Sequence, residues 1–312
     1  MSVELLKIGA RGSPLSLAQT GLVAAALEKA NPGLTTEIIP IKTTGDKMRD
    51  VSLAIIGGKG VFVKEIEEAL LDGRIDLAVH SAKDMPSELP PGLTIAAVPE
   101  REDFRDLLVT RAAGGLAALS KGALVGTSGL RRQAQILAAR PDVKIVPIRG
   151  NVATRMEKVK DEVEATLLAV SGLKRLGLTP QYAEAMSPEI MLPACGQGIL
   201  ALECRADNEK VLRLAEPIGH RPTMLALAAE RGFLNQLGSG CQLPVAALAI
   251  LSGDAMTIDG LIAAVDGGRI IRGQKKAELD SIAGATNFGK TLAEELLAKG
   301  GAEIMKAAGL RD

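Results

Sequence analysis

Arginine side chains recur in this sequence where a predicted strand ends and a helix begins. The arginines concerned are Arg11, Arg131, Arg132, Arg149, Arg155 and Arg175. Ligands of open α/β sheets bind at the carboxyl ends of the strands, where helix N-termini add partial positive charge. The planar guanidinium fork binds carboxylates and phosphates through two parallel hydrogen bonds. Although each arginine alone could be a solvated surface charge, their recurrence predicts a ligand that carries several carboxylates or phosphates.

A lysine and an aspartate stand side by side where another predicted strand ends, in DLAVHSAKDMPSELP (76–90). Lys83 and Asp84 would commonly be a plain surface pair. In a cleft rich in arginines, however, a carboxylate can stabilise a developing cation and move protons. We therefore interpret Asp84 as a candidate catalytic carboxylate. We expect His80, at the end of the apolar strand, to be a structural residue.

One of the three cysteines, Cys241, lies in the glycine-rich turn LGSGCQLP (237–244). The glycines before it leave its sulfur uncrowded, and Pro244 prevents a helix from continuing through the turn. The odd cysteine count, with no framework spacing, fits a reducing compartment. We expect Cys195 and Cys204 to be buried and inert. With only two histidines and scattered cysteines, we expect no metal site.

These candidates need a scaffold, and short apolar strands alternate with helices in the first part of the chain. The patterns predict strands over 5–10, 36–41, 75–79 and 93–98, and helices over 14–30 and 61–71. Ser13 is the predicted N-cap of the first helix. The glycine-rich segment 57–60 would be either a mobile loop over a site or a linker, and Phe62 would either face a planar ligand or pack. The alternation predicts an α/β layer with a largely parallel sheet.

A second alternating block follows the charged connection PEREDFRD (99–106). Its predicted strands cover 107–110, 123–126, 143–148 and 165–170, and its predicted helices begin near 128, 151 and 171. After a break at 187–198, the chain changes character beyond about residue 221. A helix to 237, strands to about 277 and helices over 279–309 predict a small α+β domain.

Composition limits the function classes. The 312 residues include 37 basic and 37 acidic side chains, so no global field attracts nucleic acid or an anionic membrane. Aromatic residues make up 2% of the chain, which disfavours base-stacking surfaces. The sequence contains neither a P-loop nor a complete dinucleotide fingerprint, and we recognise no signal peptide or membrane-spanning segment. We expect a soluble cytoplasmic protein with no nucleic-acid or membrane partner.

Seven motifs occur in the order found in one enzyme family. They are RGSPLSLAQ (11–19), KGVFVKEIE (59–67), DLAVHSAKDMP (76–86), GTSGLRRQAQ (126–135), IRGNVATR (148–155), LPACGQG (192–198) and LGSGCQLPVA (237–246). Through these motifs, over nearly its whole length, the chain resembles the hydroxymethylbilane synthase (porphobilinogen deaminase) family. The resemblance implies a transferase that condenses four porphobilinogens head to tail with release of ammonia. The product is then hydrolysed to free hydroxymethylbilane, in tetrapyrrole (haem) biosynthesis.

The resemblance also implies a fold and a cofactor. The implied fold is α/β, with two lobes like those of type II periplasmic binding proteins and a small α+β C-terminal domain. The implied domains are 1–98 with about 199–217, 103–193, and 221–312. A dipyrromethane cofactor would be bound covalently, as a thioether, to Cys241. Porphobilinogen and polypyrrole intermediates would be the ligands of a monomer.

Individual roles follow from the motifs in the same way, and Asp84 matches the catalytic carboxylate. The cofactor would be held by Lys83, Asp84, Thr127, Arg131, Arg132 and Cys241, and the substrate by Arg11, Ser13, Phe62, Arg149, Arg155 and Arg175. Gly129 stands where the family usually has a second serine, so one hydroxyl contact to the cofactor would be missing. The alternative is a cytosolic two-lobed binding protein for a polycarboxylate metabolite, in which Cys241 would be incidental.

Overall fold

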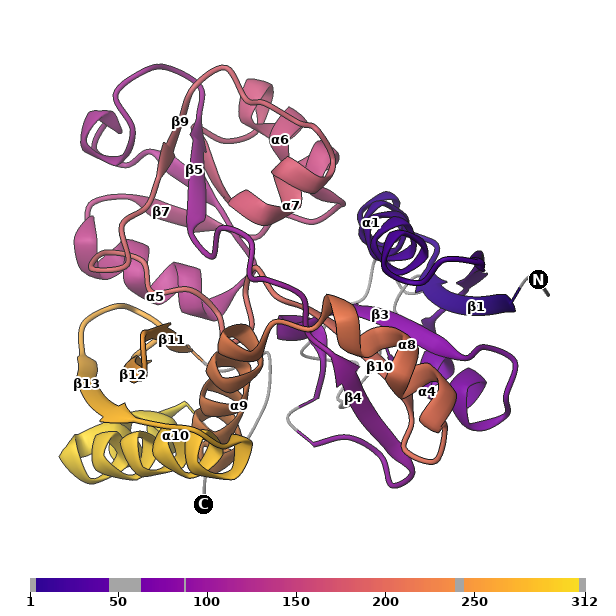
Figure 1. Ribbon diagram of the computed structural model, residues 1–312. Helices are drawn as coiled ribbons and strands as arrows, with labels where there is room; N and C mark the ends of the chain where they lie inside the picture. Colours follow the sequence, from indigo (N-terminus) through magenta and orange to yellow (C-terminus); the bar gives the residue numbers. More distant parts are fainter. Residues whose placement is uncertain (1–3, 45–62, 87, 239–243, 309–312) are drawn as a thin grey trace. The chain divides into compact units, whose positions relative to one another are not determined.

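The computed structural model describes residues 4–44, 63–86, 88–238 and 244–308, whose strands form three sheets (Figure 1). Phe62, Cys241 and the segment 57–60 lie outside the described residues. The chain divides into two compact units. The first unit comprises Met1–Arg101 and Ile199–Met224, and the second comprises Glu102–Gly198 and Leu225–Asp312. The division into three domains stays a prediction.

A five-stranded sheet with helices on both faces forms the first unit. Its elements are β1 (Glu4–Arg11), α1 (Pro14–Ala30), β2 (Leu34–Ile41), α4 (Lys64–Leu71), β3 (Leu77–Ser81), the 3-10 turn η1 (Ala82–Asp84), β4 (Leu93–Ala97), β10 (Leu200–Arg205), α8 (Glu209–Ala215) and the 3-10 turn η3 (Glu216–Ile218). On one face, Leu27 of α1 and Val211 of α8 join Ile8 in a common core. On the other, Leu70 of α4 packs with Ala78.

The prediction that this sheet is largely parallel is wrong, because two of its four pairs of neighbouring strands are antiparallel. The strand order is β2-β1-β3-β10-β4; β1 runs parallel to β2 and β3, but β10 runs antiparallel to both β3 and β4. The cause is the path of the chain, because β10 is the strand that follows the long excursion through residues 102–198. It therefore enters the sheet from the opposite end to the strands made before the excursion.

The second unit contains a sheet of the same design. Its elements are β5 (Asp106–Thr110), the 3-10 turn η2 (Leu116–Ala118), β6 (Leu124–Gly126), α5 (Leu130–Ala139), β7 (Lys144–Val146), α6 (Val152–Asp161), β8 (Ala165–Ala169), α7 (Val170–Arg175) and β9 (Ala183–Ala185). The order is β7-β6-β8-β5-β9, with β6 parallel to β7 and β8, and β5 antiparallel to β8 and β9. The chain thus has two α/β lobes, as predicted, each built on a five-stranded sheet of mixed strand direction.

Local capping signals fix where the helices of the two lobes begin. Ser13 caps α1, because its Oγ accepts a hydrogen bond from the backbone N–H of Ser16 at 3.2 Å. Asn151 caps α6 in the same way, and its Oδ1 accepts from the N–H of Thr154 at 2.9 Å. Each cap satisfies a backbone donor that the first helical turn leaves without an intrahelical partner. The predicted starts of both helices are confirmed.

An antiparallel sheet covered by helices forms the C-terminal part of the chain (Figure 1). Its elements are α9 (Arg221–Gln236), β11 (Val245–Ser252), β12 (Ala255–Ala263), β13 (Ile270–Glu278), α10 (Ile282–Leu296), the π-helical turn η4 (Leu297–Gly301) and α11 (Ala302–Ala307). Phe233 of α9 and Leu292 of α10 share its core. The two helices can approach closely because a Cβ on Gly289 would lie 1.8 Å from the carbonyl oxygen of Ala229. This part is the small α+β domain that the sequence predicted.

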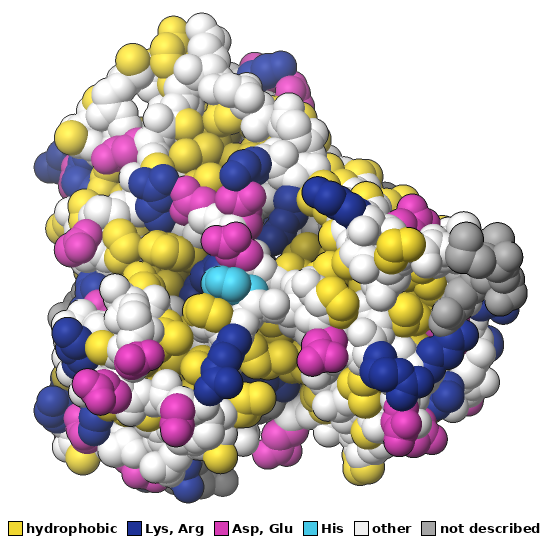
Figure 2. All heavy atoms as spheres, viewed as in Figure 1, with side chains coloured by type: hydrophobic (Ala, Val, Ile, Leu, Met, Phe, Trp, Pro, Cys, Tyr) yellow, Lys and Arg dark blue, Asp and Glu magenta, His cyan; other side chains and the backbone are white. Residues whose placement is uncertain are grey.

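Basic and acidic side chains are interspersed on the face of the molecule shown in Figure 2. This mixing agrees with the equal numbers, 37 of each, in the whole chain. In the part of the chain that the structure describes, no helix is long and apolar enough to cross a membrane. The same residues contain no group of three or more histidine, cysteine, aspartate or glutamate side chains that could hold a metal ion.

Candidate cofactor and substrate site

A pocket in the first unit lies at the carboxyl ends of β1 and β3. Its polar lining includes Arg11, Ser13, Ser16, His80, Ser81 and Asp84. Three predicted site residues, Arg11, Ser13 and Asp84, therefore lie in one pocket, because β1 and β3 are parallel neighbours that end at the same edge of the sheet. A guanidinium and hydroxyl groups beside a carboxylate can bind an anionic ligand and exchange protons with it.

Hydrogen bonds hold the turn between β1 and α1 in place. Ser16 Oγ accepts from the backbone N–H of Arg11 at 3.1 Å. One turn further along α1, the side-chain amide of Gln19 donates to Ser81 Oγ at 3.0 Å. The start of α1, with its partial positive charge, is thereby tied to the strand end that leads to Asp84.

Asp84 lies in the 3-10 turn η1, directly after β3. The backbone N–H of the buried Ala82 donates to the carbonyl oxygen of Ile199 at 3.0 Å, which anchors the base of this turn. Lys83 is half-buried, whereas Asp84 is exposed. The turn therefore presents the Asp84 carboxylate to solvent from a fixed backbone.

His80 also belongs to the pocket lining, which sequence reasoning did not anticipate. As expected of a structural residue, it is buried, and its Nε2 lies 2.9 Å from Oε2 of Glu203. Glu203 lies on β10, 123 residues away along the chain, so no local pattern could have indicated the pair.

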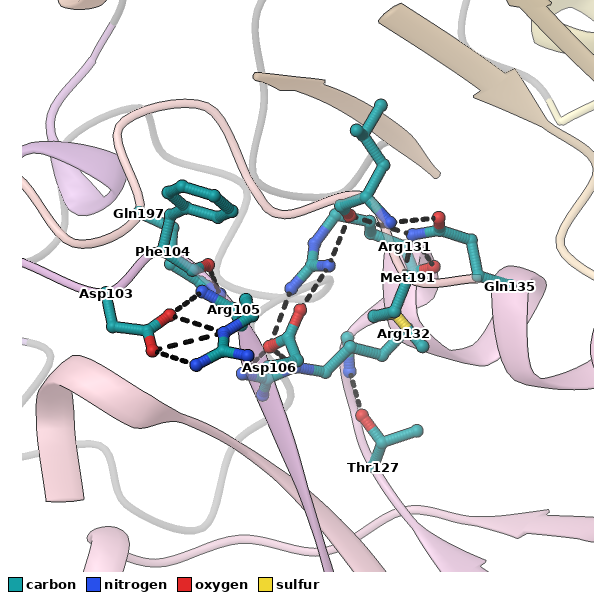
Figure 3. Close-up of polar contacts among 12 residues, drawn as sticks. Asp103, Phe104, Arg105, Asp106, Thr127, Arg131, Arg132, Gln135, Met191 and Gln197 are labelled. Carbon is teal, nitrogen blue, oxygen red and sulfur yellow. Dashed lines mark hydrogen bonds and ion pairs between the residues drawn. The ribbon is translucent and has the colours of Figure 1, made fainter. Parts of the chain in front are cut away.

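A buried ion-pair cluster in the second unit holds Arg131 and Arg132 (Figure 3). Both guanidiniums bind the carboxylate of Asp106, the first residue of β5, with Nη–Oδ distances of 2.7 Å. Arg131 Nη1 also donates to the carbonyl oxygen of Leu192 at 2.8 Å. Asp106 has no exposed surface. Sequence reasoning missed Asp106 because it ends the charged run 99–106, which resembles a solvated connection.

The two guanidiniums decide the charge of Asp106. Burial alone would raise the pKa of this carboxyl, but the charges and hydrogen bonds of Arg131 and Arg132 outweigh burial and hold the pKa far below its usual range. The carboxylate is therefore ionised. Two cations and one anion leave the cluster with an uncompensated positive charge.

The other predicted contacts of the second unit follow its parallel strands. Thr127 comes directly after β6 and is buried, and Arg149 follows β7 on an exposed connection. Arg155 Nε donates to a backbone carbonyl oxygen at 2.8 Å. Arg175 Nη2 donates to another at 2.7 Å, and burial lowers the pKa of its guanidinium. These four side chains thus come from segments that begin at the carboxyl ends of β6, β7 and β8.

The flanks of the cysteine turn are fixed, although Cys241 itself lies outside the described residues. The helix before the turn, α9, carries the fully buried Glu230. One carboxylate oxygen of Glu230 accepts the N–H of Ala249 on β11 at 2.8 Å, and the other accepts the N–H of Gly196 at 2.6 Å. Glu230 therefore ties the helix that precedes the turn to the strand that follows it.

Comparison with family models identifies the kind of protein. The model described as "Porphobilinogen deaminase, dipyromethane cofactor binding domain" matches residues 6–213, and "Porphobilinogen deaminase, C-terminal domain" matches residues 224–298. The chain belongs to the porphobilinogen deaminase family. As a member of it, the chain is a transferase with hydroxymethylbilane synthase activity and a dipyrromethane cofactor, as the motifs predicted. The alternative of a two-lobed binding protein is not favoured.

Relatives named porphobilinogen deaminase match over nearly their full length. The protein of Syntrophotalea carbinolica is 50% identical over 308 residues, which cover 98% of this chain and 97% of the relative. The protein of Syntrophomonas wolfei is 51% identical over 301 residues, which cover 96% of this chain and 97% of that relative. Among solved structures, the effector binding domain of BenM with benzoate is similar at 15% identity and a TM-score of 0.43, over 70% of this chain and 91% of that one.

The side chains present suit a dipyrromethane. Such a group carries carboxylates and pyrrole N–H groups, so its site needs cations together with a hydrogen-bond acceptor. The first unit offers Arg11 and the carboxylate of Asp84 in one pocket. In the second unit, the cluster around Asp106 retains one uncompensated positive charge. Side chains suited to such a group are therefore present in each unit.

Gly129, where the family usually has serine, is the N-cap of α5. Its N–H donates to Thr127 Oγ1 at 3.2 Å. A Cβ at Gly129 would meet the same oxygen at 3.8 Å, an ordinary contact, and its φ of −90° suits any residue. The glycine therefore removes a hydroxyl from the turn without requiring a different backbone.

The two other cysteines of the chain, Cys195 and Cys204, are both buried. Burial, assisted by the charge of Glu203, raises the pKa of the Cys204 thiol to about 11. Because the thiolate is the reactive form, we expect iodoacetamide at about pH 8 to alkylate Cys204 roughly 100-fold more slowly in the native protein than in urea. Peptide mass spectrometry after timed labelling measures both rates. Equal rates in the two states would contradict the expectation.

Proposed function

We propose that Asp84 is the catalytic carboxylate of this chain and that Cys241 carries the dipyrromethane. In this proposal, four porphobilinogens are condensed head to tail with release of ammonia, and the product is hydrolysed to free hydroxymethylbilane. The observation that supports it most directly is the pocket in which the exposed Asp84 shares a lining with Arg11 and Ser13. The cofactor, when bound, supplies the pyrrole carbon to which the first substrate is joined.

Asp84 would serve both charge and proton transfer. Positive charge develops on the substrate as ammonia leaves, and a fixed carboxylate stabilises it without solvent reorganisation. The same group, as a carboxyl, can donate a proton to the leaving amine. As a carboxylate, it can later accept the proton that the ring carbon loses when the new carbon–carbon bond is complete. The proton count at Asp84 is then restored after each addition. Lys83 would contact the cofactor beside it.

Arginines would bind the carboxylates that accumulate as the chain grows. Each porphobilinogen brings an acetate and a propionate group, so the site must accept two further negative charges at each addition. We assign Arg11 and Ser13 to the substrate in the first unit. In the second unit, we assign Arg149, Arg155 and Arg175 to substrate binding. We assign Thr127, Arg131 and Arg132 to cofactor binding. Phe62 would contact a pyrrole ring.

We further propose that the protein acts in the cytoplasm as a monomer, with porphobilinogen and polypyrrole intermediates as its ligands. The balance of 37 basic and 37 acidic side chains supports the absence of a nucleic-acid partner.

Intact-mass spectrometry tests the proposed attachment. The purified protein is expected to be heavier than its sequence by one dipyrromethane, and Cys241→Ser should lose the increment. Cys195→Ser is the matched control, because Cys195 is buried, and it should keep the increment. An unchanged increment in Cys241→Ser would remove Cys241 from the proposal. A wild-type mass equal to that of the sequence alone would remove the covalent cofactor.

A further inference from the structure

Three buried titratable side chains lie in the first unit, one of them in the lining of the Asp84 pocket, and the proposed chemistry uses none of them. They are Glu67 on α4, His80 on β3 and Glu203 on β10, with exposed fractions of 8%, 5% and 0%. His80 belongs to the pocket lining, and its Nε2 lies 2.9 Å from Oε2 of Glu203.

The sheet register explains how they meet. β3 and β10 are antiparallel, and His80 pairs with Ala201. Glu203 lies two residues beyond Ala201 and therefore projects from the same face. That face also carries Ala78, which packs with residues of α4, the helix that supplies Glu67.

Two carboxylate oxygens in this group lack a donor. Oε1 of Glu67 and Oε1 of Glu203 are both buried, and neither has a hydrogen-bond partner among the described residues. An unpartnered buried oxygen is costly, and more so when it carries charge. A proton on one of the two carboxyls would turn one acceptor into a donor, which could then bond to an acceptor within its reach.

Burial and the neighbouring charges favour such a proton on Glu67. Burial foremost, and then the charge of Glu203, raise the pKa of Glu67 to about 7, while His80 opposes the shift. The other charged residues on the strands packed against α4 are Glu4, Lys7 and Arg11 of β1 and Arg205 of β10. On α4 itself they are Lys64, Glu65 and Glu68.

We propose that Glu67 and Glu203 form a hydrogen-bonded carboxyl–carboxylate pair that orients His80 in the pocket wall, which makes His80 a positioning residue for the site of Asp84. This inference rests on the proposed function of that pocket. While Glu67 keeps its proton, it adds no charge behind His80 and Glu203, whose Nε2 and Oε2 lie 2.9 Å apart. When Glu67 loses the proton, a further negative charge lies close to a pocket that must receive a polycarboxylate substrate. Substrate binding therefore weakens as the pH rises through about 7.

The same proton links the pair to stability. A carboxyl whose pKa is raised on folding stabilises the folded state. This stabilisation is fully present below about pH 4.5 and is lost as the pH rises to about 7. The melting temperature of Glu67→Gln, which cannot ionise, should lack this dependence. Glu68→Gln is the matched control, because Glu68 is the next residue of α4 and its side chain is 52% exposed.

Infrared spectroscopy of the holoenzyme tests the pair directly. The difference spectrum of wild type minus Glu67→Gln should contain the carbonyl stretch of a protonated carboxyl, which disappears with a midpoint near pH 7. The Glu68→Gln spectrum should match that of wild type. The absence of this band, or its retention in Glu67→Gln, would overturn the carboxyl pair.

Steady-state kinetics across the same pH range test the positioning role. We expect the KM of wild type and of Glu68→Gln to rise about fivefold as Glu67 ionises, the effect of one added charge near the pocket, while that of Glu67→Gln stays flat. Matching pH profiles in all three proteins would overturn the role of His80. Failure of the proposed role of Asp84 would differ, because Asp84→Asn would then turn over at close to the wild-type rate at every pH.

Discussion

Replacing Asp84 with asparagine is expected to lower kcat by about 100- to 10,000-fold, the usual contribution of a positioned acid or base. The amide keeps the size of the side chain but can neither exchange a proton nor balance the charge that develops as ammonia leaves. Single-turnover release of ammonia, measured on holoenzyme, separates this step from product hydrolysis. Because Asp84 lies on an exposed turn, the variant should fold normally.

Two measurements make the Asp84 result specific. Intact mass should show that Asp84→Asn retains the cofactor. Asp72→Asn, at a side chain that is 65% exposed in the same unit, should turn over at the wild-type rate. A kcat for Asp84→Asn within a few-fold of wild type would remove this carboxylate from the mechanism.

Asp106→Asn is expected to destabilise the second unit by about 3–5 kcal/mol, because it leaves two buried guanidiniums without their counter-ion. The carboxylate accepts from both Arg131 and Arg132, and a neutral amide cannot replace those contacts. Since the pKa of Asp106 is lowered on folding, the ionised carboxylate stabilises the folded state above about pH 3.8, and this stabilisation is lost as the pH falls further. Urea denaturation at neutral and acid pH measures both effects.

A neighbouring aspartate supplies the control. Asp103 binds Arg105 at 2.7 Å, but the Arg105 side chain is 44% exposed. Exposed ion pairs contribute about 1 kcal/mol or less, so Asp103→Asn should change the free energy of unfolding little. Equal losses in the two variants would show that burial of the Asp106 cluster does not set its strength.

Local signals carried much of what the sequence could predict. Ser13 before an apolar helical pattern located the start of α1, because a side-chain cap needs only residues three positions apart. The strands were also recognisable, since a buried strand is a short apolar run. The pocket residues Arg11 and Asp84 could both be proposed because each lies at the carboxyl end of a strand, and the two strands belong to the same sheet.

Non-local partners were beyond such reasoning. Asp106 looks like one more charge in 99–106, and only the fold buries it against Arg131 and Arg132. His80 and Glu203 are 123 residues apart, and their contact depends on the pairing of β3 with β10. The antiparallel course of β10 was missed for the same reason, since an apolar run carries no sign of its direction.

The position of β10 has a consequence for how the protein is made. β3 and β4 leave the ribosome before residues 102–198, whereas the strand that belongs between them emerges after that stretch. Until then each exposes an open backbone edge, which invites pairing with other chains. The strands β5–β9 all lie within 106–185, so theirs is the first sheet that can be completed during translation. The lobe that carries Asp84 is therefore the first to be synthesised in part, but the second whose sheet can be completed.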